Sequence, residues 1–161
     1  MLKTLEAAML ARDWFEEIRW QVLRVERAQA DLEAMRLTLG AHGQKYEATG
    51  HGTVGDGVDA ILAFVEAQTD LEIARIKLTA ELERATAVLY GRSGRGGLAK
   101  VRCSADADCI TGYYLLGYSW RQVADEMVRP DSRDAEQWCK RRAYRALAAL
   151  DEYDWRELIN S

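Results

Sequence analysis

The sequence predicts an all-α protein in which a long N-terminal antiparallel helical hairpin precedes three shorter C-terminal helices. Its 161 residues include a single proline, and Ala, Leu, Glu and Arg, which favour helices, are abundant. Six glycines fall in residues 40–57 and four in residues 91–97. We expect both clusters to be loops, because glycine weakens a helix interior. Elsewhere, apolar residues recur every three or four positions, which is the spacing of one helix face.

Residues 1–39 and 57–90 are expected to form the two hairpin helices. The first carries one apolar row, which ends at Leu39, and the second carries two rows, which begin at Val58 and at Leu71. Two helices alone enclose little interior, so the hairpin needs a third helix or a second copy to complete its core. The sequence therefore predicts that residues 1–90 form a self-association domain and that the protein is a homo-oligomer.

Composition predicts a soluble, cytoplasmic protein without membrane contact. Residues 109–120 form the longest uncharged run, which is too short to span a bilayer. Glu6, Arg12 and Asp13 interrupt the N-terminal region, so no signal peptide is expected. The three cysteines form no C-x-x-C pair, which fits a reducing compartment.

A net charge of −4 conceals two basic segments. Residues 84–102 carry five basic and no acidic side chains, and residues 134–150 carry four basic and two acidic ones. The first segment includes the predicted Gly/Arg-rich linker, residues 91–97. This basic segment could hold a DNA backbone or be a solvated linker without contacts. The candidate backbone contacts are Arg92, Arg95, Lys100 and Arg102.

Residues 98–161 are expected to contain three helices. The first covers about 98–116 and closes at Gly117. The second opens at Ser119, which with Gln122 three positions later has the pattern of a capping box, and it stops before Pro130. The third runs to about Leu150, with Cys139, Ala143, Ala146, Leu147 and Leu150 on its buried side.

A short helix, a turn and a basic helix are the parts of a helix-turn-helix. With that buried side inward, helical geometry places Gln137, Lys140, Arg141, Tyr144 and Arg145 on the outer arc. Side chains of these types read base edges and hold phosphates in a major groove. Ser132 and Arg133 of the preceding turn join this candidate DNA-binding set. The alternative is a solvated amphipathic helix whose arginines only confer solubility.

Residues 110–150 resemble a known family, above all in YYLLGYSWRQVADEM followed by Ser132 and WCKRRAYRALAAL. The stretch is similar to the C-terminal helix-turn-helix of phage and prophage transcriptional regulators of the ArpU/RinA type, which look like region four of bacterial sigma factors. The matching positions are Tyr113, Gly117, Ser119, Trp120, Val123, Ala124, Ser132, Arg142, Ala146, Leu147 and Leu150. The long charged helix, Gly-rich loop and acidic helix before them also resemble small phage proteins of this type.

The resemblance implies a regulator of late phage or prophage genes that acts in the cytoplasm of a bacterial host. Its expected partners are double-stranded DNA and further copies of itself, with RNA polymerase as a candidate contact. Two alternatives stay open. One is a terminase small subunit, which also joins a helix-turn-helix to an oligomerising helical region. The other is a helical adaptor that binds a protein partner and no DNA.

Catalytic and metal-binding patterns are weak. His42, His51, Cys103 and Cys109 are the candidate metal ligands, but their spacing lacks the close pairs of zinc sites. GRSGRGG lacks the Gly-Lys-Ser/Thr ending of a phosphate-binding loop. We therefore expect no enzyme activity, no metal and no cofactor.

Overall fold

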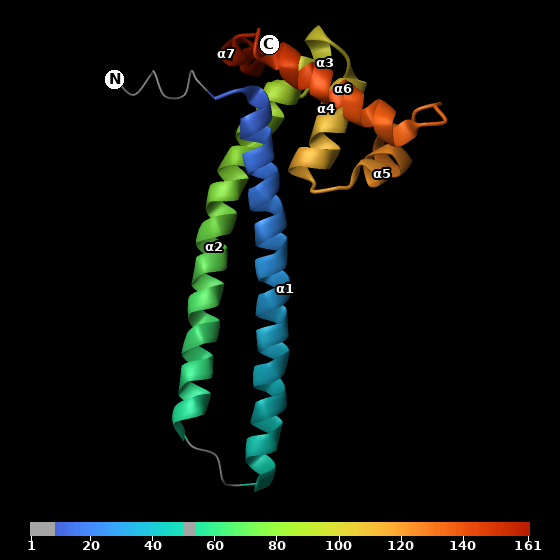
Figure 1. Cartoon of the computed structure of the whole chain (residues 1–161). Coiled ribbons are helices and arrows are strands. Elements are labelled where there is room, and N and C mark those ends of the chain that lie inside the picture. Colours follow the sequence, from blue (N-terminus) through green and yellow to red (C-terminus); the bar gives the residue numbers. More distant parts are fainter. Residues whose placement is uncertain (1–8, 50–53) are drawn as a thin grey trace. The chain divides into compact units, whose positions relative to one another are not determined.

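The structure, a computed structural model, describes residues 9–49 and 54–161, without the side chains of 42–49 and 54–56. Every regular element in these residues is helical, which confirms the all-α prediction (Figure 1). In chain order they are α1 (Ala11–Thr49), α2 (Val54–Tyr90), α3 (Gly97–Val101), α4 (Ser104–Ile110), the π-helical turn η2 (Thr111–Leu115), α5 (Trp120–Gln122), the π-helical turn η3 (Val123–Val128), α6 (Ala135–Leu150) and α7 (Trp155–Asn160). No helix within the described ranges is long and apolar enough to cross a bilayer.

The described chain divides into two compact units. The first combines residues 9–22 with residues 79–161, and the second is residues 23–78. The expected boundary at residue 90 therefore differs from the observed division. The reason is that both ends of the hairpin contribute to the core of the first unit: Trp14 stacks on Trp155 of α7, and Phe15 meets Tyr114 edge to face.

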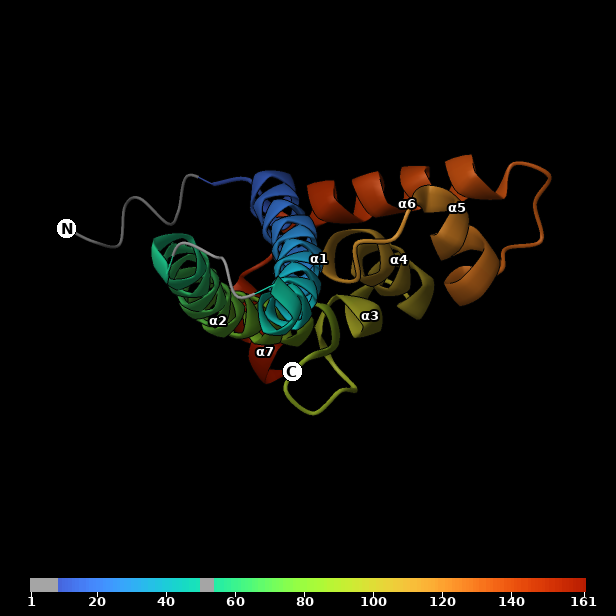
Figure 2. The same cartoon turned by 90° about the horizontal axis from the view of Figure 1, so that it is seen from below.

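The second unit is the hairpin itself, in which α1 and α2 run side by side in opposite directions (Figures 1 and 2). The expectation that residues 40–57 form a loop is wrong, because α1 continues to Thr49 and α2 begins at Val54. Good helix formers stand between these glycines, and a helix already begun gains one hydrogen bond for each residue it adds. That gain offsets a cost of about 1 kcal/mol for each glycine.

In the first unit, α6 packs against α4, α5 and η3 (Figures 1 and 2). The predicted single helix over 98–116 is wrong, since the chain is extended at Cys103 and η2 replaces the last α-helical turn. The third helix is confirmed, with Cys139, Ala143, Ala146, Leu147 and Leu150 all buried. Helix α7 was not expected; its Leu158 is buried and Asp154 caps its start.

The second of the three helices begins as predicted. The Ser119 hydroxyl accepts a hydrogen bond from the Gln122 amide, and the Gln122 side chain accepts one from the Ser119 amide, so the capping box is confirmed. Val123 and Ala124 are buried, whereas Trp120 and Met127 are half-buried. The helix ends at Val128, where Arg129 adopts the left-handed conformation with φ of 44°.

The glycine-rich loop over 91–97 lies inside the first unit and does not connect the two units. Gly91, Gly96 and Gly97 are buried. The Gly97 amide donates to the Ser161 hydroxyl over 2.7 Å, and the Arg92 amide donates to the Ile159 carbonyl over 3.0 Å. These bonds tie the loop to the segment that carries α7.

This packing predicts unequal effects of alanine at two loop glycines. Gly94 and Gly97 both have positive φ, but a Cβ at Gly94 would meet open space, whereas one at Gly97 would lie 2.6 Å from backbone atoms of residues 89–91. We expect Gly94→Ala to lower the free energy of unfolding by about 1–2 kcal/mol. Gly97→Ala should cost about 1–3 kcal/mol more. Urea unfolding measures both, and equal losses would contradict this account of the loop.

Candidate nucleic-acid interface

A buried carboxylate joins the helices that would form a helix-turn-helix. Asp106 of α4 is 2% exposed. It accepts hydrogen bonds from Arg102 Nε over 2.8 Å and from Arg142 Nε of α6 over 2.6 Å. Arg142 Nη2 also lies 2.9 Å from Cys103 Sγ, in the extended segment before α4. These contacts fix α6 to the start of α4.

The two guanidinium groups compensate for the burial of Asp106. Burial alone would raise the pKa of its carboxyl group, but the hydrogen bonds from Arg102 and Arg142 outweigh this effect and lower the pKa below its usual value. In turn, the hydrogen bond to Asp106 raises the pKa of Arg142. Asp106 is therefore ionised at neutral pH.

The buried apolar row of α6 and the Arg142–Asp106 ion pair together set which side of α6 faces solvent. Successive residues in an α-helix are about 100° apart, so Arg141 and Arg145 project away from the buried side. Gln137, Arg141 and Arg145 are exposed, and Lys140 and Tyr144 are half-buried. Arg141 Nε donates to the Gln137 carbonyl over 3.3 Å, which lays its stem along the helix. The structure thus places all five predicted outer-arc residues on the accessible side of α6.

Aromatic rings pack beside this face. Tyr113 and Trp120 stack with centroids 3.9 Å apart, and Trp120 and Tyr144 form a T-shaped pair with centroids 6.2 Å apart. The Arg19 guanidinium covers the Tyr113 ring and donates to the backbone carbonyls of Tyr113 and Tyr118. Tyr144 is therefore held in place by its aromatic neighbours.

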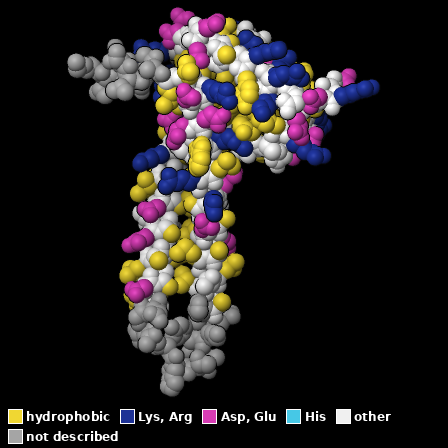
Figure 3. Space-filling model, in the orientation of Figure 1, with side chains coloured by type: hydrophobic (Ala, Val, Ile, Leu, Met, Phe, Trp, Pro, Cys, Tyr) yellow, Lys and Arg dark blue, Asp and Glu magenta, His cyan; other side chains and the backbone are white. Residues whose placement is uncertain are grey.

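Arg12 of α1 reaches the same face, with its guanidinium carbon 4.4 Å from the centre of the Tyr144 ring. Lys140 Nζ lies 5.8 Å from that centre. Four basic side chains thus surround or adjoin Tyr144. We define the basic face as Tyr144 with these four residues: Arg12, Lys140, Arg141 and Arg145. Residues 137–150 contain no acidic side chain. In Figure 3, Lys and Arg side chains gather over the part of the molecule that holds α5 and α6.

The turn before α6 has mixed charge. Ser132 and Arg133 are exposed, and the Ser132 hydroxyl accepts a hydrogen bond from the Asp134 amide over 3.3 Å. Asp134 occupies the N-cap position, but its side chain makes no capping hydrogen bond. Glu136 in the first turn is also exposed. The N-terminal end of α6 is therefore less favourable to phosphate than the basic face.

The four candidate backbone contacts behave differently from one another. Arg92, Arg95 and Lys100 have exposed side chains. Arg102 is paired with Asp106, so its role is structural.

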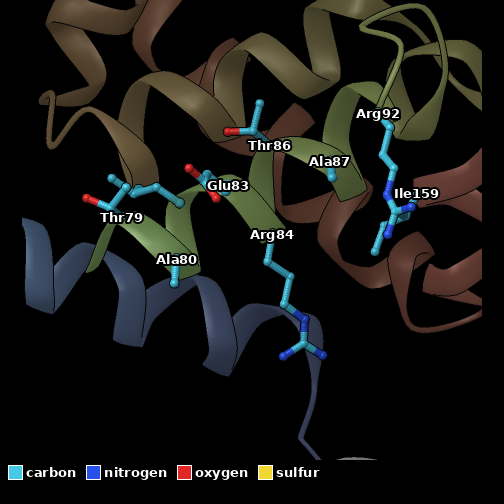
Figure 4. Close-up of a pocket in the computed structure, with 10 residues that line it drawn as sticks. Thr79, Ala80, Glu83, Arg84, Thr86, Ala87, Arg92 and Ile159 are labelled. Carbon is cyan, nitrogen blue, oxygen red and sulfur yellow. The ribbon is translucent and has the colours of Figure 1, made fainter. Parts of the chain in front are cut away.

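A shallow groove lies beside Arg92, and Figure 4 shows Arg92 beside Ile159 at one end of it. The groove is lined by Thr79, Ala80, Leu82, Glu83, Arg84, Thr86, Ala87, Gly91, Arg92 and Ile159.

The cysteines lie in or near the core. Cys109 and Cys139 are buried, and burial raises the pKa of both thiols, so both stay protonated at neutral pH. Among the described residues, no group of three or more His, Cys, Asp or Glu side chains is placed to hold a metal ion. Of the candidate ligands, the His42 side chain and His51 lie outside the described parts of the chain.

Sequence reasoning missed three positioning residues: Asp106, Arg12 and Arg19. The spacing of Arg102 and Asp106, four positions apart in the sequence, was a signal for an ion pair. Arg12 and Arg19 gave no signal, because their aromatic partners are about 100 or more residues away in the chain.

No protein-family model, curated protein or solved structure matches the chain. The interpretation of its function therefore depends on the residues and their geometry.

The Asp106 cluster predicts a sharp difference between two adjacent arginines. Arg142→Met leaves the buried carboxylate with a single partner and should lower the free energy of unfolding by about 3–5 kcal/mol. Arg141→Met is the matched control. It removes an exposed charge from the same helix and should change stability by less than about 0.5 kcal/mol. Chemical unfolding followed by circular dichroism distinguishes these results, and similar losses in both variants would exclude the proposed anchoring role.

The lowered pKa of Asp106 predicts a pH dependence with a definite sign. Its stabilising effect is complete above the pKa of the unfolded chain, about 4, and declines as the pH falls through the lower folded-state value. Asp106→Asn has no such titration. The stability difference between the parent and Asp106→Asn should therefore shrink as the pH is lowered from 5 towards 2. A difference that stays constant in urea unfolding over this range would refute the assignment.

Proposed function

We propose that this protein binds double-stranded DNA through the basic face and the exposed side of α6, and acts as a phage or prophage transcriptional regulator. The observation that carries the proposal is the exposure of Gln137, Arg141 and Arg145 on one side of a helix whose opposite side is buried against α4 and α5. Arginine and glutamine are side chains that read guanine and adenine in the major groove.

The order of the elements supports the proposal. The segment from α5 to η3 ends at the left-handed Arg129, and α6 begins at Ala135. A helix, a turn and a helix follow in the order of the DNA-binding motif, and we assign α6 the role of the recognition helix. The resemblance of residues 110–150 to ArpU/RinA-type regulators points the same way.

Charge determines which part of α6 would touch DNA. Asp134 and Glu136 make the first turn unfavourable to phosphate, whereas residues 137–150 are free of acidic side chains. We therefore assign the main contacts to Arg141, Tyr144 and Arg145 on a tilted helix. Gln137 lies at the edge of that contact. We also assign a flanking phosphate contact to Arg12, whose guanidinium lies over the Tyr144 ring.

The decisive experiment measures binding to a duplex selected by the protein from a random library. Fluorescence anisotropy at two salt concentrations gives the affinity and the salt dependence. Arg141→Ala should weaken binding by about 1–3 kcal/mol, and removing one side chain that binds a phosphate should lower the salt slope by about one. The double variant Arg141→Ala/Arg145→Ala should bind least.

A matched control removes the same charge elsewhere. Arg24 and Arg27 are exposed on α1 in the hairpin unit, so Arg24→Ala/Arg27→Ala should bind as the parent does. Both double variants should unfold within about 0.5 kcal/mol of the parent, because all four side chains are exposed. If the Arg141/Arg145 variant binds the selected duplex as tightly as the parent, the basic face does not bind DNA, and the helical adaptor becomes the better interpretation.

A further inference from the structure

Arg19 of α1 holds the bend that leads into the helix-turn-helix. Its Nη1 donates hydrogen bonds to the backbone carbonyls of Tyr113 and Tyr118, the second over 3.0 Å. These carbonyls lie on either side of Gly117, which has a positive φ of 72°. Tyr113 belongs to η2, and Tyr118 directly precedes the capping box at Ser119. One guanidinium group therefore connects η2 to the start of α5.

The same guanidinium group begins a series of ring contacts. Its carbon lies 3.7 Å from the centre of the Tyr113 ring. The Tyr113 and Trp120 rings are nearly parallel, with an angle of 4° between their planes. Trp120 then forms the T-shaped pair with Tyr144 of α6. Three successive contacts thus join α1 to the basic face, and we call the residues that make them the aromatic bridge: Arg19, Tyr113, Trp120 and Tyr144.

The core supports the aromatic bridge from its buried side. Tyr114 is completely buried, and its ring meets Tyr113 and Trp120 edge-on, with centroids 4.9 and 6.4 Å apart. Phe15 of α1 packs edge-on against Tyr114 in turn. The four residues of the bridge are themselves half-buried. Contacts between the planar groups, rather than complete burial, therefore set the orientation of each ring.

A second arginine of α1 reaches the end of the bridge. Arg12 and Arg19 are about two turns apart on the same side of α1. Arg12 is exposed and adjoins Tyr144 directly. Arg19 is half-buried, and its guanidinium group is held by the Tyr113 ring and two carbonyls. Arg19 therefore influences the basic face through other residues, whereas Arg12 is part of that face.

We propose that Arg19 is a positioning residue for DNA binding and that it sets the orientation of Tyr144 through Tyr113 and Trp120. This inference rests on the proposed function of the basic face. A group that is already held in its bound orientation loses less freedom on association, so the affinity depends on what holds it. Arg19 then raises the affinity for DNA without touching DNA.

Tyrosine ring resonances of the free protein test the aromatic bridge without DNA. In protein labelled with ¹³C-tyrosine, Arg19→Met should shift or broaden the ring signals of Tyr144, although two rings separate the residues. Tyr153, which follows α6, is the reference ring and should keep its signals. In a Trp120→Leu background, Arg19→Met should no longer move the Tyr144 signals. Tyr144 signals that do not respond to Arg19→Met, or that respond equally in both backgrounds, would overturn the proposal.

Binding to the selected duplex tests the consequence for function. Arg19→Met and Arg19→Lys should both bind about three- to thirtyfold more weakly than the parent, because Tyr144 is no longer held in place. Lysine keeps the charge but lacks the planar group that stacks on Tyr113. The salt slope should stay at the parent value in both variants, since Arg19 binds no phosphate, whereas Arg12→Met should lower it by about one.

Two further variants serve as controls. Arg24→Met removes an exposed charge from α1 and should bind as the parent does. Tyr113→Leu removes the stack while leaving the backbone carbonyls to Arg19, and it should weaken binding with an unchanged salt slope. Circular dichroism should show the helix content of the parent in every variant. If Arg19→Met loses helix content, Arg19→Lys and Tyr113→Leu carry the test.

The two proposals fail in different ways. A parent that binds no duplex at either salt concentration would contradict the proposed function. The Tyr144 signals of the free protein decide the aromatic bridge in either case. Arg19→Lys that binds as tightly as the parent would show that only the charge of Arg19 matters, and a lower salt slope in Arg19→Met would show that Arg19 binds phosphate. Either result would overturn the positioning role.

Discussion

The buried carboxylate of Asp106 is the constraint on which the first compact unit depends. An ionised group that is 2% exposed is tolerated only with partners, and here they are Arg102 and Arg142. The ion pair with Arg142 and the buried row from Cys139 to Leu150 together set the rotation of α6 about its axis. The side of α6 opposite its apolar row then carries Gln137, Arg141 and Arg145. These structural contacts thereby determine which charges remain available to a ligand.

Local patterns predicted much of the fold. The capping box at Ser119, the stop before Pro130 and the buried row from Cys139 to Leu150 are all local, and the structure confirms them. The predictions that were wrong involve non-local effects. Gly40 lies within α1 because neighbouring residues propagate the helix. The break at Cys103 accompanies contacts with Arg142, 39 positions away, which no local pattern reveals.

The candidate site was predicted only in part, because some of its residues are brought together by non-local contacts. The outer arc of α6 follows from helical spacing alone, so its five residues could be named from the sequence. Arg12 could not be added, because only the tertiary fold brings α1 beside Tyr144. Arg102 was assigned to DNA by its charge, but its bond to Asp106 gives it a place in the fold. Charge alone does not separate an arginine that binds a ligand from one that holds the structure together.

The central claim is that the exposed side of α6 is the surface that meets DNA. The most direct test is a titration of the ¹⁵N-labelled protein with a duplex of about 20 base pairs at low salt, followed by amide chemical shifts. The account predicts that the largest changes occur at Gln137, Arg141, Tyr144 and Arg145, with little change along residues 58–76. Absence of shifts on α6, or shifts confined to the hairpin unit, would contradict it.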